Sequence, residues 1–278
     1  MLISKVKDHY GESLSGESVN RKTYPPVYPF TCSPFIINFV FLIFIFEFFI
    51  HTHVAYSFNI PEKLEYDLTW TGIKAGTSTL EITNAGNNIK IISTARSAKW
   101  VSVFYTVDDR VETILTKNTG YQFVGQPVNY RLKIREGRHR RDKEVIFKHD
   151  IGKVFYVDHL INEKREFDVP SFIFDPLSSF YYLRTLKLEV GRSVYVTIFD
   201  SKKIWNVEVQ VLGKEKVTIS TGTVDTIVIK PLMQSEGIFY KKGDIYIWLT
   251  DDAKRIPVKL KTKVAVGSVT ATLVGGSY

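Results

Sequence analysis

Beyond residue 60 the chain alternates apolar and polar residues, and this alternation is its strongest structural constraint. Residues 62–70, EKLEYDLTW, show the pattern clearly. One face of this segment carries Leu64, Tyr66, Leu68 and Trp70, and the other carries Glu65, Asp67 and Thr69. Because successive side chains of a β-strand point to opposite faces, the pattern predicts a strand with one buried face.

The same alternation recurs at spacings of about 8–12 residues, with turn residues such as Gly, Asn and Asp between the segments. Further strands are predicted at residues 72–82, 89–97, 107–115, 121–125, 128–147 (a hairpin), 152–160, 193–199, 203–213, 215–221, 222–232, 237–243, 244–250, 256–264 and 267–274. No helix-strand alternation or domain-scale linker interrupts them. The pattern therefore predicts a single all-β domain over residues 58–278, built as an antiparallel curved sheet, half-barrel or barrel.

Two short helices are expected to interrupt the strands. The first lies in residues 175–191, DPLSSFYYLRTLKLEVG, where Asp175 suits the N-cap and Pro176 the first helical position. Apolar residues occupy all sides of this helix, which predicts that it is buried and plugs or flanks the sheet. Residues 98–105, AKWVSVFY, favour the second short helix.

An apolar segment near the amino end determines where the domain is expected to reside. Residues 35–50 are almost wholly apolar, and Glu47 interrupts them, which fits a signal-peptide core of about 12 residues better than a spanning helix of about 20. Ala55-Tyr56-Ser57 offers a cleavage site before Phe58. The polar leader before the segment is long, so either the start codon lies further along or the segment is a retained signal anchor. Both alternatives for residues 1–57 predict an exported domain, in the periplasm or at the outer face of the cytoplasmic membrane, and a retained segment 35–50 would associate with the membrane.

Charge indicates the kind of partner that such a domain meets. Residues 1–57 carry equal numbers of acidic and basic side chains, so the formal net charge of +8 belongs to the domain. An exported basic domain encounters anionic lipid, lipopolysaccharide or acidic glycan rather than nucleic acid, although solubility alone also explains the charge. Cys32, the only cysteine, precludes an intrachain disulfide and has no lipobox around it. The oligomeric state is left open.

The predicted hairpin 128–147 carries the densest basic cluster. Its candidate ligand-binding cations are Arg131, Lys133, Arg135, Arg138, Arg140 and Arg141. The ordinary interpretation is a charged strand edge that resists aggregation. The alternative is a site for phosphate or carboxylate groups, which Arg binds in a bidentate manner.

The abundant aromatic residues are the second candidate binding feature. Trp70, Tyr181 and Trp248 are predicted to contribute to a concave surface that holds an apolar or amphipathic ligand. Filling of the core is the simpler account of the same residues.

Catalytic and metal-binding patterns are weak. Asp251-Asp252 fits a hairpin turn better than an acid-base pair, because Asp is favoured in turns. His139, His149 and His159 recur near aspartates, but their spacing is wider than zinc ligands normally show. No nucleophile elbow, phosphate loop or dinucleotide fingerprint is present. The sequence thus predicts no catalytic residues, no metal site and no cofactor.

Four segments carry a resemblance to a known family. They are residues 65–82, 95–113, 174–191 and 247–273. In this order they resemble a bacterial family of exported proteins, the domain of unknown function 3108, over nearly all of residues 62–274. The resemblance implies a signal peptide followed by an all-β domain, and it implies no activity. The strand-turn-strand pattern also looks like that of periplasmic lipoprotein carriers, which is a likeness of fold only.

These observations favour a non-enzymatic binding protein of the cell envelope, whose ligand is amphipathic or lipid-like and anionic. A structural or assembly factor of the envelope without a small ligand is the alternative. An enzyme acting on envelope glycans or lipids is the third candidate, and it would need a carboxylate or histidine with a perturbed pKa in a pocket.

Overall fold

The structure, a computed structural model, describes residues 59–117, 125–232, 244–264 and 266–278. The predicted leader 1–57, with its apolar core 35–50, lies outside these residues. So do the predicted strand 237–243 and most of the predicted strand 121–125. Within the described ranges, no helix combines the length and the hydrophobicity needed to cross a lipid bilayer.

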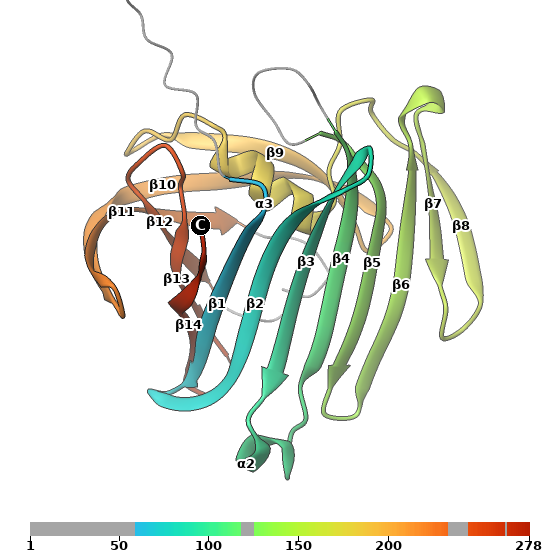
Figure 1. The fold of residues 1–278 in the computed structure, drawn as a ribbon. Coiled ribbons are helices and arrows are strands. Elements are labelled where there is room, and N and C mark those ends of the chain that lie inside the picture. The colour runs from blue at the N-terminus through green and yellow to red at the C-terminus, as the bar shows by residue number, and fades with distance from the viewer. Residues whose placement is uncertain (1–58, 118–124, 233–243, 265) are drawn as a thin grey trace, which may run out of the picture. The chain divides into compact units, whose positions relative to one another are not determined.

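The described strands form one antiparallel sheet (Figure 1). They are β1 (Glu62–Trp70), β2 (Ile73–Ala85), β3 (Asn88–Ser97), β4 (Asp108–Thr116), β5 (Pro127–Glu136), β6 (His139–Lys148), β7 (Lys153–Asp158), β8 (Glu163–Asp168), β9 (Ser193–Asp200), β10 (Lys203–Ile219), β11 (Gly222–Leu232), β12 (Ile245–Thr250), β13 (Pro257–Lys263) and β14 (Ser268–Ser277). Their spatial order is β8-β7-β6-β5-β4-β3-β2-β1-β14-β13-β12-β11-β10-β9. The prediction of an all-β antiparallel fold is confirmed.

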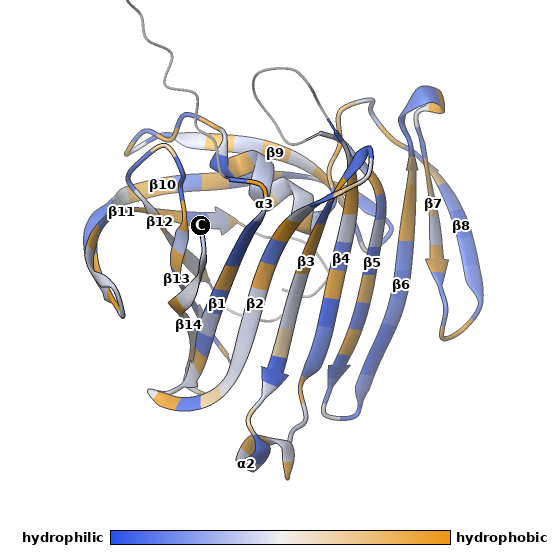
Figure 2. Ribbon diagram, in the orientation of Figure 1, coloured by the Kyte–Doolittle hydropathy of each residue, from blue (hydrophilic) through white to orange (hydrophobic). Residues whose placement is uncertain are grey.

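Alternation places one face of each strand in the core. Along β1, Leu64 and Tyr66 are buried while Lys63 and Glu65 form an ion pair on the other face. Figure 2 shows the same exchange of hydrophobic and hydrophilic residues along the strands from β1 to β5. The buried side chains pack into three hydrophobic clusters on the sheet and against its longer helix.

Two strands differ from the sequence prediction. β8, with the sequence EKREFD, was not predicted, because it is almost wholly charged and shows no apolar alternation. Residues 203–213 and 215–221 were predicted as two strands, but β10 runs without a break to Ile219. A register shift between Val211 and Gly213 absorbs the extra residue, so that the interruption in the pattern is a bulge rather than a turn.

The first and last of the described strands pair in the interior of the sheet. β1 pairs with β2 on one side and with β14 on the other. The edges of the sheet are therefore two strands from the middle of the chain, β8 and β9.

These edge strands contact each other through side chains. The rings of Phe167 on β8 and Phe199 on β9 lie 5.3 Å apart. Lys202, in the turn after β9, lies 2.6 Å from the carboxylate of Glu163 on β8 and 5.2 Å from the ring of Tyr156 on β7. Phe174 adds an isolated bridge to β9. Side-chain contacts therefore join the two edges of the sheet. We call these contacts the β8–β9 seam.

Both predicted helices are present. Helix α3 (Pro176–Arg184) begins at Asp175 with a capping box, as its sequence predicts. It packs on the inner face of the sheet, against β3, β4 and β9. The Arg184 guanidinium, fully buried, donates to both carboxylate oxygens of Glu62, at 2.7 and 2.8 Å, which fixes the end of α3 to the start of β1. The second helix, α2 (Lys99–Ser102), is shorter than predicted.

Candidate functional site

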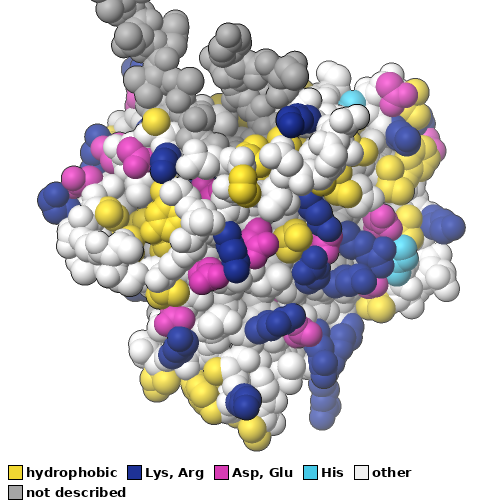
Figure 3. Space-filling model, in the orientation of Figure 1, with side chains coloured by type: hydrophobic (Ala, Val, Ile, Leu, Met, Phe, Trp, Pro, Cys, Tyr) yellow, Lys and Arg dark blue, Asp and Glu magenta, His cyan; other side chains and the backbone are white. Residues whose placement is uncertain are grey.

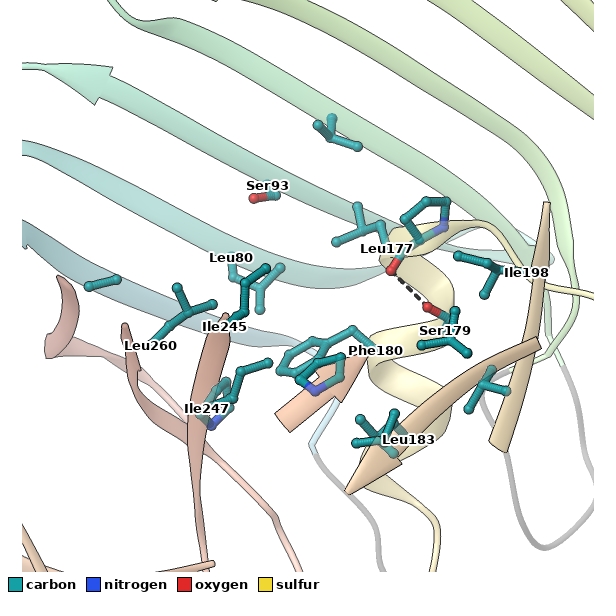
Figure 4. Close-up of a pocket in the computed structure, with 18 of the residues that line it drawn as sticks. Leu80, Ser93, Leu177, Ser179, Phe180, Leu183, Ile198, Ile245, Ile247 and Leu260 are labelled. Atoms are coloured by element: carbon teal, nitrogen blue, oxygen red, sulfur yellow. Dashed lines mark hydrogen bonds between the residues drawn. The ribbon is translucent and has the colours of Figure 1, made fainter. Parts of the chain in front are cut away.

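A cavity of about 290 Å³ lies between the inner face of the sheet and α3 (Figure 4). Strands from both halves of the sheet contribute to it, together with one side of the helix. Its lining comprises Tyr66, Ser78, Leu80, Ser93, Val111, Tyr130, Pro176, Leu177, Ser179, Phe180, Leu183, Val196, Ile198, Val207, Val209, Pro231, Ile245, Ile247, Pro257, Lys259, Leu260 and Ala271. Ligand sites are concave and mostly apolar, so this partly open cavity is the main candidate site.

The lining is apolar because two amphipathic patterns meet there. β9, β10 and β12 present alternate Val and Ile side chains, such as Ile198, Val209 and Ile247. Opposite them α3 presents Phe180 and Leu183, and Figure 4 shows these side chains facing the strands. The helix that the sequence predicts as a plug therefore forms one wall of the cavity.

Small residues on β2 and β3 create the space. The inward positions at one end of these strands carry Gly76, Ser78, Ser93 and Ala95. Cross-strand partners share a face, and Ser78 pairs with Tyr66 and Ala95, while Ser93 pairs with Leu80. Towards the other end of the same strands the inward positions carry larger side chains, among them Ile82. Sequence reasoning missed this change from large to small inward residues, which is visible in the alternation itself.

Tyr130 provides an unsatisfied polar group at the cavity. Its side chain is only 4% exposed, and its hydroxyl has no hydrogen-bond partner among the described residues. Burial raises the pKa of Tyr130 well above its ordinary value, and the nearby carboxylates of Asp200 and Asp175 raise it further. A buried hydroxyl without a partner is costly, so a polar atom of a ligand would stabilise it.

Two cations lie on the same inner face. Lys143 pairs across the sheet with Leu132, and Arg141 pairs with Ile134; both of these apolar partners are buried. Since cross-strand partners point to one face, Arg141 and Lys143 face inwards. Burial lowers the pKa of Lys143, and the charge of Arg141 lowers it further.

The other predicted cations are placed elsewhere. Arg131 donates to Asp142 at 3.0 Å and to Glu144 at 3.3 Å on the outer face. Lys133, Arg135 and Arg140 share that outer face, and Arg138 lies in the β5–β6 turn. Figure 3 shows Lys and Arg side chains gathered over β5 and β6. None of the six lines the cavity. The edge-protection interpretation does not hold for the cations of β5, which lies between β4 and β6. It stands for Arg140 and Arg141, because β7 pairs with β6 only from Lys143 to Lys148.

The three predicted aromatic residues are not brought together. Trp70 donates its indole N–H to the carbonyl of Val266 at 2.8 Å. Tyr181 is fully buried beside Arg184. Trp248 donates to Glu215 at 2.7 Å and lines a second hollow of about 370 Å³. Their part in ligand binding stays a prediction.

The candidates for acid-base or metal chemistry are engaged in local structure. Asp252 accepts hydrogen bonds from the backbone of Lys254 and Arg255, as in a turn. The ammonium of Lys214, 2.5 Å from Asp251, lowers the pKa of that carboxyl. Within the described ranges, no group of three or more His, Cys, Asp or Glu side chains is placed to hold a metal ion.

The histidines of the weak zinc pattern have separate partners. His139 accepts from Arg141, His149 contacts the carbonyl of Pro127 at 2.7 Å, and His159 contacts Glu144 at 2.9 Å.

A similar solved structure supports this fold. A crystal structure of a β-barrel-like protein of the domain of unknown function DUF1849, from Brucella abortus, is similar with a TM-score of 0.50 and 12% identity. The match covers 80% of this chain and 98% of that one. A protein from Parabacteroides distasonis, provisionally assigned as a lipoprotein, matches at a TM-score of 0.32 and 9% identity over the same shares of the two chains.

At the level of sequence, no curated protein matches the chain. Residues 65–274 match the profile of a family described as "Protein of unknown function (DUF3108)". This match spans most of the chain and agrees with the resemblance seen in its four segments. The chain therefore belongs to the DUF3108 family.

Proposed function

We propose that the chain is a non-enzymatic binding protein that holds a lipid-like, amphipathic ligand in the cavity between α3 and the sheet. The observation that carries this proposal is the cavity itself, about 290 Å³ lined almost entirely by aliphatic and aromatic side chains. An apolar chain is the ligand that such walls favour, because its burial removes apolar surface from water.

The apolar walls supply free energy for binding. Each methylene group of a ligand that leaves water for an apolar lining contributes about 0.8 kcal/mol. Close contact with the lining side chains adds dispersion attraction.

The polar groups beside the cavity favour an anionic head. The hydroxyl of Tyr130 has no partner among the described residues, and neither Arg141 nor Lys143 forms an ion pair with another of them. Asp158 and Asp200 also lie close to Lys143 and reduce the positive field there. The charge of Arg141 acts on Tyr130, so this cation lies near the hydroxyl. A carboxylate or phosphate head beside Tyr130 would accept hydrogen bonds from such donors. Of the cations predicted from the sequence, only Arg141 belongs to this group.

Binding is favoured over catalysis by the character of the lining, to which the described part of the chain contributes no Asp, Glu, His or Cys. The alternative of an envelope assembly factor without a ligand would fit an interior filled with side chains, and the apolar space supports the binding protein instead. The predicted leader supports export, so the proposed ligand is a lipid of the cell envelope.

Extraction of the purified full-length protein with organic solvent, followed by mass spectrometry, tests the proposal. The expected result is a co-purified anionic lipid. Ser93→Leu fills the space from β3 and is expected to abolish the bound lipid without unfolding the protein, whereas Ser93→Ala keeps the space and the lipid. A protein that is free of lipid in all three forms, and that takes up no fatty acid when it is added, would contradict the proposal. A bound neutral lipid would leave the cavity assignment standing and overturn the assignment of the head.

A further inference from the structure

An unusual set of exposed apolar side chains lies at one end of the sheet, around α2. We call this set the α2 tip; it consists of Ile73, Trp100, Val103, Phe104 and Tyr105. Their exposed fractions are 63%, 44%, 86%, 63% and 46%. Single exposed apolar residues are normal, but a group of large ones indicates an interaction surface.

The α2 tip is held in place by the surrounding structure. The indole N–H of Trp100 donates to the carbonyl of Lys74 at 3.0 Å, and the rings of Trp100 and Phe104 lie 6.0 Å apart. Tyr105 packs so closely on Gly137 that a side chain there would meet its ring. The α2 tip is therefore joined to the start of β2 on one side and to the β5–β6 turn on the other.

Cations border the α2 tip. Lys99 within α2 and Arg138 beside Gly137 are exposed and form no ion pair with other described residues. Lys133 and Arg135 follow on the outer face of β5. Of the nearby carboxylates, Asp108 pairs with Arg96 and Asp109 accepts from the backbone of Arg135. Glu136 also lies close to Tyr105 and reduces the positive charge of the border. Figure 3 shows hydrophobic side chains at the end where α2 lies, beside a column of Lys and Arg.

We infer that the α2 tip is a docking surface for an anionic lipid membrane. Trp and Tyr place their amphipathic rings at the level of lipid head groups, with aliphatic and Phe side chains below them. Lys and Arg beside such residues are attracted to anionic heads, and their long stems extend over the apolar region. The charge of the border matches a negative lipid surface.

The position of the α2 tip agrees with this inference. The wall of small residues on β2 and β3, which makes room for the cavity, runs towards α2: the hydroxyl of Ser97, at the end of β3, lies 2.7 Å from that of Ser102 in α2. The inference does not depend on the proposed ligand, since a ligand-free protein can still dock on a membrane.

Fluorescence quenching of the full chain by vesicles with brominated acyl chains tests the inference. Because residues 35–50 could hold the chain on a vesicle by themselves, the readout is contact between Trp100 and the acyl chains. With phosphatidylglycerol vesicles we expect quenching that Trp100→Phe largely removes and that Trp205→Phe, at the start of β10, leaves in place. Vesicles of phosphatidylcholine alone should quench little.

Variants of the border and of the apolar side chains sharpen the test. Val103→Ser with Phe104→Ser should abolish the quenching of Trp100, whereas Leu160→Ser with Ile161→Ser, an exposed apolar pair in the β7–β8 turn, should not. Lys99→Gln and Arg138→Gln should each weaken docking about fivefold. Absence of Trp100-dependent quenching in both kinds of vesicle would overturn the inference. So would loss of a dimer in the Val103→Ser, Phe104→Ser protein by sedimentation, because a second copy would then be the partner.

Discussion

At the scale of single residues, Asp175 shows how a buried charge is retained. Its carboxylate accepts hydrogen bonds from the backbone of Leu177 and Ser178, and from the hydroxyls of Ser178 and Thr113 at 2.7 Å. These bonds lower the pKa of Asp175, but burial raises it by more, so the net shift is upwards. The N-cap of α3 therefore costs free energy when it is ionised.

This shift predicts a pH dependence of stability. A carboxyl whose folded pKa is raised binds its proton more tightly in the folded state, so stability falls as pH rises from about 3.9, the pKa in an unfolded chain, through the folded pKa. Asp175→Asn keeps a good N-cap and removes this titration. Relative to Asp175→Asn, the native protein should lose about 1.4 kcal/mol of unfolding free energy for each pH unit by which folding raises the pKa of Asp175. Urea unfolding at pH 3 to pH 8 gives the unfolding free energy of both proteins. The same dependence on pH in the two proteins would contradict the prediction.

The sequence predicts the direction of side chains only where apolar and polar residues alternate along a strand. On β5, Tyr130, Leu132 and Ile134 point inwards and Arg131 and Lys133 outwards, as the sequence indicates. On β6 the segment before Val145 is a run of charged residues in which alternation carries no signal. The inward positions of Arg141 and Lys143 follow from the pairing of β6 with β5, so the candidate head-group site could not be seen in the sequence.

At the scale of secondary structure elements, the β8–β9 seam replaces a hydrogen-bonded ladder between the two edges. Its apolar contact is the pair of Phe167 and Phe199, and its ion pair joins Lys202 to Glu163. Local sequence was sufficient to predict the strands in which apolar and polar residues alternate, and the capped helix α3. The partners of the edge strands depend on contacts between residues that are far apart in the sequence.

Loss of the apolar contact should weaken the fold. Phe199 is 1% exposed, and Phe199→Ala should cost about 3–5 kcal/mol through lost burial and the cavity left behind. The matched control is Tyr195→Ala on the same strand, where the side chain is 57% exposed and the expected change is within about 0.5 kcal/mol. Chemical denaturation at equilibrium measures both. Equal stabilities of the two variants would show that the contact does not hold the edges together.

At the scale of the whole molecule, the interior position of β14 determines which parts are dispensable. β14 pairs with both β1 and β13, so its removal would expose two strands in the middle of the sheet.

A chain ending at Lys263 is therefore expected to be insoluble or to lack the far-ultraviolet dichroism of the native sheet. A chain lacking only Tyr278 keeps all of β14 and should fold as the native protein does. Soluble yield and circular dichroism compare the two. A folded, soluble product without β14 would contradict the strand order described above.

The pairing of β1 with β14 also governs when the protein can become folded. β1 is made early, but its neighbour β14 is absent until Ser268–Ser277 have left the ribosome. Hairpins such as β5–β6 can form during synthesis, but the two halves of the sheet can be joined only afterwards. Every newly made molecule thus passes through a stage of incompletely assembled halves, in which a chaperone, or a machinery that threads unfolded polypeptides, has time to act.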